Sequence, residues 1–186
     1  MEKRLTRDEL LNSFLRRAEN PFTTMEQKND IRRILMESNT MRGMNHLFLV
    51  KCYFNEEQPL FHISKEEAIR QAKLAYRENN RGAFYYLYLL LKDSDHVRAR
   101  NYLRLSCSCG NPQAYLEKAK LQHRGILFEE NKEEAFSNYK IAAQCGLSDG
   151  YYGMLLLASE QGNIKLARQV YNEAKEHGVY LPGVVE

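Results

Sequence analysis

The stretch NPQAYLEKAKLQHRGILFEENKEEAFSNYKIAAQCG, residues 111–146, carries the signals that decide the fold. Asn111 and Pro112 form a strong helix start, because asparagine caps the first free amides and proline suits the first helical position. A second start follows at 131–134, where an asparagine precedes Lys-Glu-Glu. Gly146 stands where the second helix should end, in a position suited to a left-handed cap. The stretch therefore predicts two successive helices joined by a short loop.

The same pattern recurs along the chain. Glycines 110, 146 and 178 each follow a helix that begins at an alanine eleven residues earlier, and they are spaced by 36 and 32 residues. A further copy begins at Ala68 and has Asn79 in place of glycine. Four residues after a terminator comes another small residue that begins a helix, as at Ala83, Ala114 and Gly150. The repeating unit is thus a helix pair of 31–36 residues, present three to four times.

These repeats resemble a known family. Residues 114–125, then Glu134-Ala135, Tyr139, Ala142-Ala143 and Gly146, look like the Sel-1-like repeat (SLR), a relative of the tetratricopeptide repeat. The resemblance is best over 111–178 and fainter over 64–110. It implies an α-solenoid of stacked antiparallel helix pairs, because a single pair cannot cover its own apolar face.

The sequence also departs from the SLR pattern. Glu134 stands where the family has lysine, and Asn138 stands where it has tryptophan. Lys118 and Gln122 occupy positions that are normally apolar. All four polar residues fall in the best-matching copy, and Lys118 and Gln122 leave the phase of the helix over 112–124 open by about one residue.

The whole chain is predicted to be all-α, with about ten helices and short connections. Capping boxes at Thr6, Thr24 and Ser64 mark three of the starts, and the segment 55–59 separates two helices. Gly and Pro, 10 and 4 in 186 residues, are too scarce for a sandwich or barrel with many tight turns. We expect one continuous domain, with an N-terminal helical cap over 1–40, repeats over 41–178 and a tail over 179–186. A compact helical bundle is the alternative architecture.

No catalytic or metal-binding motif stands out. The five histidines form no HExxH pattern and no zinc spacing, and there is no phosphate-binding glycine loop. The four cysteines, Cys52, Cys107, Cys109 and Cys145, lack a CxxC spacing and are expected to be small buried residues. We therefore expect a protein without enzymatic activity, cofactor or metal.

No stretch approaches 18 uninterrupted apolar residues, and the first residues are charged rather than an apolar leader. These features predict a cytoplasmic protein with no membrane partner.

The charge distribution leaves a second possibility. Residues 64–124 carry twelve basic and six acidic side chains, although the net charge of the chain is only +3. Arg98, Arg100 and Arg104 in this segment could contact phosphate, so a nucleic-acid binder is the alternative function. No helix-turn-helix signature or aromatic stacking platform accompanies them, and a protein partner is favoured.

The resemblance implies where such a partner would bind. The first helix of each pair lines the concave surface of the repeat family, and the family includes adaptors, scaffolds and immunity proteins that neutralise toxins. Tyrosine and arginine at these positions suit an interface with an acidic or aromatic segment of a partner, although each tyrosine could equally fill the core. The predicted concave-face residues are Tyr85, Leu89, Lys92, Leu116, Lys120, His123, Arg124, Tyr152 and Leu156.

Overall fold

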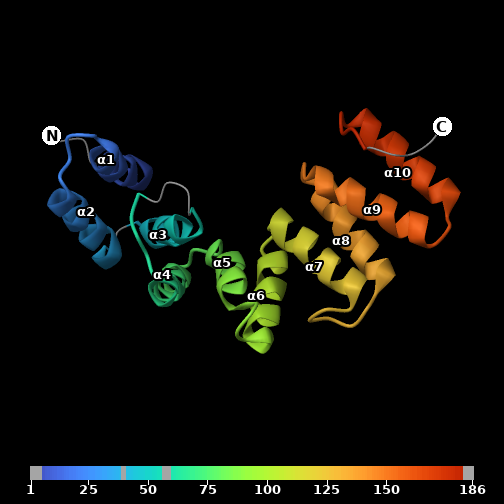
Figure 1. Cartoon of the computed structure of the whole chain (residues 1–186), viewed down its shortest axis with the longest axis horizontal. Helices are drawn as coiled ribbons and strands as arrows, with labels where there is room; N and C mark the ends of the chain where they lie inside the picture. Colours follow the sequence, from blue (N-terminus) through green and yellow to red (C-terminus); the bar gives the residue numbers. More distant parts are fainter. Residues whose placement is uncertain (1–5, 39–40, 56–59, 182–186) are drawn as a thin grey trace. The chain divides into compact units, whose positions relative to one another are not determined.

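The computed structural model describes residues 6–38, 41–55 and 60–181, and this part of the chain contains ten α-helices and no β-strand (Figure 1). The all-α prediction is confirmed. The helices cluster into two compact units, Met1–Asp95 and His96–Glu186. The first unit contains α1 (Arg7–Glu19), α2 (Met25–Glu37), α3 (Met44–Phe54), α4 (Lys65–Arg77) and α5 (Ala83–Leu91). The second contains α6 (His96–Ser108), α7 (Pro112–Arg124), α8 (Lys132–Gln144), α9 (Ser148–Glu160) and α10 (Ile164–Glu176).

The helix starts follow the capping signals, with one difference. Thr6 and Thr24 each form the full reciprocal box at the start of α1 and α2. Ser64 forms only half of its box: its hydroxyl accepts from the backbone amide of Glu67 at 3.2 Å. The Glu67 carboxylate instead accepts from Arg70 and Gln71. A charge-assisted bond to arginine is stronger than a bond to a neutral amide, which explains the choice.

The repeat terminators adopt the predicted left-handed conformation. Gly146, which ends α8, has a φ of +90°, and Gly110 and Gly178 have φ values of +77° and +72°. Asn79 has a φ of +68° at the equivalent position after α4. Asparagine tolerates this region better than most residues, so the copy without glycine still ends in the same way.

The first unit encloses its own hydrophobic core and buried polar contacts. Ile31, Leu35 and Leu49 are almost fully buried in that core, which is built by α1, α2, α3 and Phe61. His46 on α3 is also buried, and its Nδ1 lies 2.6 Å from Oε1 of Gln71 on α4. This hydrogen bond joins α3 to α4 without leaving the ring nitrogen unsatisfied.

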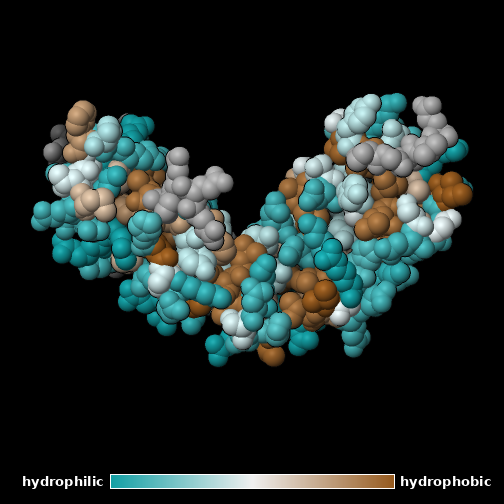
Figure 2. Space-filling model, viewed as in Figure 1, coloured by the Kyte–Doolittle hydropathy of each residue, from teal (hydrophilic) through white to brown (hydrophobic). Residues whose placement is uncertain are grey.

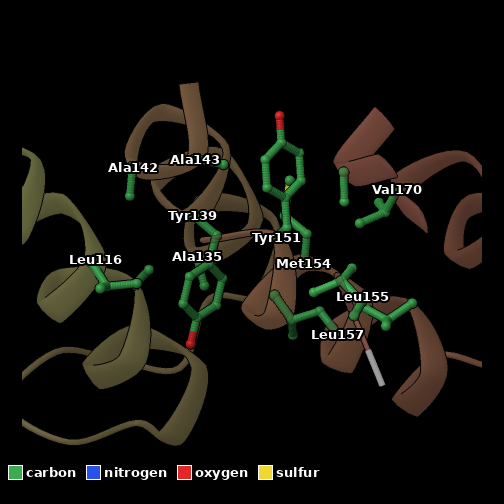
Figure 3. Packing of buried hydrophobic residues seen from close by; sticks show 13 residues of the cluster. Leu116, Ala135, Tyr139, Ala142, Ala143, Tyr151, Met154, Leu155, Leu157 and Val170 are labelled. Atoms are coloured by element: carbon green, nitrogen blue, oxygen red, sulfur yellow. The ribbon is translucent and has the colours of Figure 1, made fainter. Parts of the chain in front are cut away.

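The second unit is built around α8 and α9 (Figure 3). Tyr139 and Tyr151 are both buried there, and their hydroxyls point in opposite directions. Ala142 and Ala143 are small enough for close helix packing, as the repeat pattern predicts. On α5 and α9, the buried residues include Ala83, Leu87, Leu91, Met154, Leu155 and Ala158, each within its own unit.

The cysteine prediction is half right. Cys52 and Cys107 are buried, and burial raises the pKa of the Cys107 thiol to about 11. Cys109 and Cys145 are exposed, so the prediction was wrong for them. Both come directly before a terminal glycine, where the helix has ended and the side chain no longer faces a neighbouring helix.

At the C-terminal side, Leu181 is buried in the core of the second unit and Val179 packs against it. The rest of the predicted tail, residues 182–186, lies outside the described residues, as do 1–5, 39–40 and the predicted breaker at 56–59. The division into 1–40, 41–178 and 179–186 stays a prediction. None of the helices in the described ranges is long and apolar enough to cross a membrane.

Candidate functional site

The second unit contains a pocket of about 460 Å³ between α7 and α9, with α8 beneath it. Its lining is mixed: aromatic and aliphatic side chains stand beside charged ones. On the face shown in Figure 2 the surface is mostly hydrophilic, with hydrophobic side chains in separate groups. The pocket is lined by Lys120, His123, Arg124, Tyr139, Asp149, Tyr152, Gly153, Leu156 and Glu160.

Five of the nine predicted concave-face residues meet in this pocket: Lys120, His123, Arg124, Tyr152 and Leu156. Tyr152 is 54% exposed and Leu156 is 46% exposed. They are one helical turn apart on α9, so both side chains lie on one face of that helix. Large apolar side chains left this exposed beside a pocket are available for a partner to cover.

The other four predicted residues lie elsewhere. Leu116 is only 4% exposed because it packs in the core of the second unit, and its exposed edge lines a smaller pocket of about 230 Å³ that shares Asp149. Tyr85 and Leu89 on α5 and Lys92 at its C-terminal cap are half-buried, in the first unit. Their role in a common binding surface stays a prediction.

Charged pairs bridge α7 and α9 across the pocket. His123 Nε2 lies 3.0 Å from Glu160 Oε2, and Lys132 Nζ lies 3.4 Å from the same oxygen. The hydrogen bond with His123 is the main reason that the pKa of Glu160 is lowered. Lys120 Nζ lies 3.7 Å from Asp149 Oδ2 at the other side of the pocket. Both carboxylates in the lining are therefore charge-compensated.

Tyr139 of α8 forms the floor of the pocket. Its side chain is buried, and its ring lies nearly perpendicular to the His123 ring at a centroid distance of 6.3 Å. Its ring also lies directly against the backbone of Gly153: a Cβ there would overlap the ring and stand 2.6 Å from its Cζ. Any larger residue at 153 would displace the ring, so the glycine of α9 makes room for the tyrosine of α8.

Sequence reasoning missed four lining residues: Tyr139, Asp149, Gly153 and Glu160. Gly153 gave the clearest signal, because glycine within a helix costs about 1 kcal/mol relative to alanine and usually has a packing reason. The two acidic residues gave none, since their role depends on which cations the fold places opposite them.

The architecture of this chain is similar to that of solved SLR proteins. A protective antigen present in uropathogenic Escherichia coli strains, described as displaying an SLR fold, superposes with a TM-score of 0.71 at 16% identity. The match covers 93% of this chain and 38% of the antigen. A Sel1 repeat protein from Oxalobacter formigenes superposes with a TM-score of 0.69 at 17% identity, covering 91% of this chain and 70% of that protein. This chain has the SLR fold.

The resemblance inferred from the repeats is thus confirmed at the level of fold. The chain spans about two fifths of the length of the antigen. No protein-family model matches the sequence, and no curated protein matches it.

Within the SLR fold, the four polar departures form two complementary pairs between α7 and α8. Lys118 Nζ donates to Glu134 Oε1 at 2.7 Å. Asn138 Nδ2 donates to Gln122 Oε1 at 2.7 Å, and both of these residues are buried. Each unusual residue on one helix thus faces its partner on the other. These pairs fix which face of α7 lies against α8, which the sequence had left open by about one residue.

The arginines of the alternative function lie on α6. Arg98 is exposed, whereas Arg100 and Arg104 line a polar pocket of about 350 Å³. Glu129, Glu130 and Glu134 line the same pocket, and their charges oppose a phosphate there. The described residues contain no group of three or more His, Cys, Asp or Glu side chains that could hold a metal ion.

Proposed function

We propose that this chain is a protein-binding module that holds a segment of a partner protein in the pocket between α7 and α9. The observation that carries the proposal is the meeting of exposed Tyr152 and Leu156 with Arg124 at one pocket. Tyrosine and arginine in a central pocket are the residue types that most often dominate binding energy. The partner contributes an acidic or aromatic segment.

The module is non-enzymatic in this proposal. The two carboxylates of the pocket, Asp149 and Glu160, are each held by a basic side chain or histidine, and hydrogen bonding to His123 lowers the pKa of Glu160. A lowered pKa makes a carboxylate a weaker base at neutral pH, which disfavours a role in proton transfer. The chain then acts either as an adaptor or as an inhibitor of the immunity type. A cytoplasmic location stays a prediction from the sequence.

The test begins with random peptides displayed on phage and selected on the immobilised full chain. Enriched peptides are synthesised, and their affinity is measured by titration calorimetry. The double variant Tyr152→Ala, Leu156→Ala should weaken binding by about 30-fold or more, because removing one buried interface aromatic commonly costs about 2 kcal/mol. Both side chains are exposed in the free chain, so the variant should keep its helicity by circular dichroism.

The matched control removes the same kinds of side chain elsewhere. Tyr76 is 50% exposed on α4 and Ile164 is 76% exposed on α10, and neither lines the pocket. The control variant Tyr76→Ala, Ile164→Ala should bind as the wild type does. The proposal fails if the control loses affinity and the pocket variant does not. Recovery of salt-sensitive nucleic acid with the purified chain, without any peptide that depends on the pocket, would favour the alternative function.

A further inference from the structure

The hydroxyl of Tyr139 belongs to a residue that lines the pocket, and no described residue uses it as a hydrogen-bond donor. The Tyr139 residue is only 3% exposed, yet it lines the pocket. The side of its ring that runs to the hydroxyl end lies along Gly153, which also lines the pocket. Its hydroxyl makes no hydrogen bond with any of the described residues. In the free chain only solvent can accept this hydrogen bond, so an acceptor group of a ligand in the pocket can take the place of that water.

Arg124 supplies the charge at the same place. Arg124 lines the same pocket as Tyr139, and its positive charge lowers the pKa of Tyr139 against the larger, raising effect of burial. Arg124 is exposed, and it has no carboxylate partner within the described ranges. It is thus free to pair with an incoming anion.

The other charges of the pocket balance one another. Lys120 is paired with Asp149, and Glu160 is shared by His123 and Lys132. Arg124 therefore provides one surplus positive charge next to one unused hydroxyl donor. A singly charged acceptor group matches this arrangement.

We propose that the pocket recognises the side-chain carboxylate of an aspartate or glutamate within the partner segment, with Tyr139 donating a hydrogen bond and Arg124 pairing with the charge. This inference rests on the proposed function and specifies its partner. A carboxylate has two acceptor oxygens and no donor, so it can accept from the phenol and from the guanidinium at once. Tyr152 and Leu156 would cover the apolar neighbours of the acidic residue.

The charge balance favours a carboxylate over a phosphorylated residue. A phosphate group carries about 1.5 to 2 negative charges at neutral pH. The pocket offers one unpaired cation, and two carboxylates, Asp149 and Glu160, lie in its lining. The C-terminal carbonyls of α7 also disfavour anions at this end of the helix, so a second negative charge would add repulsion without a partner.

Two peptide libraries test the proposal directly. Both consist of acetylated and amidated nonapeptides of random sequence without Asp or Glu, except that the central residue is Glu in one library and Gln in the other. The immobilised full chain should retain the Glu library about tenfold more than the Gln library, as expected for one charge-assisted hydrogen bond. Capped termini ensure that only the side chain supplies a carboxylate.

Three variants locate the effect. Arg124→Gln and Tyr139→Phe should each reduce the Glu preference several-fold, and Tyr139→Phe keeps the ring against Gly153. Tyr151→Phe is the matched control, because the Tyr151 hydroxyl also has no partner but is fully buried and points the other way (Figure 3). It should leave the preference unchanged.

Equal retention of the two libraries by the wild type overturns the inference. So does a Glu preference that persists in Arg124→Gln or that disappears in Tyr151→Phe. These outcomes leave the proposed function standing if phage-selected peptides still lose affinity for the Tyr152→Ala, Leu156→Ala variant. Absence of any such peptide would instead remove the proposed function itself.

Discussion

The two faces of α8 pack against their neighbours in different ways. Toward α9, the contact is made by small residues: the backbone of Ala143 meets Gly150, and the ring of Tyr139 meets Gly153. Toward α7, the contact includes two polar pairs, Lys118 with Glu134 and Gln122 with Asn138. The contact with α9 requires glycines without a Cβ, whereas the contact with α7 requires that each polar side chain keeps its hydrogen-bond partner. A substitution should therefore be costly for different reasons on the two sides of one helix.

The largest effect is expected where α9 approaches the backbone of α8. A Cβ at Gly150 would stand 2.6 Å from the amide nitrogen and 2.9 Å from the Cα of Ala143, and backbone atoms cannot rotate away. Gly150→Val should lower the free energy of unfolding by more than about 3 kcal/mol, the upper range for overpacking. Urea unfolding followed by circular dichroism measures it. Ser159→Val, which places the same residue at an exposed position of α9, should change stability by less than about 1 kcal/mol. Similar losses in the two variants would contradict the close approach.

An intermediate effect is expected from the buried pair between α7 and α8. Gln122→Leu leaves the Asn138 side-chain amide buried without its acceptor, which should cost about 1–3 kcal/mol. The double variant Gln122→Leu, Asn138→Leu removes both polar groups, so its loss should be smaller than the sum of the two single losses. A double-mutant cycle from urea unfolding gives the coupling energy. A coupling near zero would show that the pair does not stabilise this interface.

The smallest effect is expected from the exposed pair. Lys118→Met should cost about 0–1 kcal/mol at pH 7, because the Glu134 side chain is 47% exposed and solvent screens the interaction. The hydrogen bond from Lys118 lowers the pKa of Glu134 below 4.5, so the stabilisation is present above that pH and is lost as the pH falls through the folded-state pKa. Urea unfolding at pH 7 and pH 3 should show the difference between wild type and Lys118→Met shrinking at pH 3. A difference that grows at pH 3 would assign the effect to packing.

Sequence reasoning anticipated the helices well because their signals are local. The caps at Thr6, Thr24 and Asn111 act within three residues of the helix start, and each caps its helix as predicted. The turn conformation at Asn79 and Gly146 depends on the residue itself. The capping box predicted at Ser64 is only half formed, because the Glu67 carboxylate accepts from Arg70 instead of from the backbone amide of Ser64.

The binding pocket was predicted only in part. The resemblance to the SLR family placed Lys120, His123 and Arg124 on the groove side of α7, and it placed Tyr152 and Leu156 together on α9. It also placed Leu116 on the α7 face, although the core of the second unit buries it. A periodic pattern gives the angle of a side chain around its own helix and says nothing about how closely the next helix approaches.

By itself, the sequence determined the helical class, the positions of the helix ends and the repeat that leads to the SLR fold, because caps, glycines and small residues act through short-range sterics and hydrogen bonds. Only the tertiary structure decided which polar residues are paired and which are free. Lys118 and Gln122, which look misplaced on an isolated α7, are matched by Glu134 and Asn138 of α8. The unpartnered hydroxyl of Tyr139 at the pocket follows from the same cause, since hydrogen-bond partners sixteen or more residues apart are chosen by the packing of whole helices.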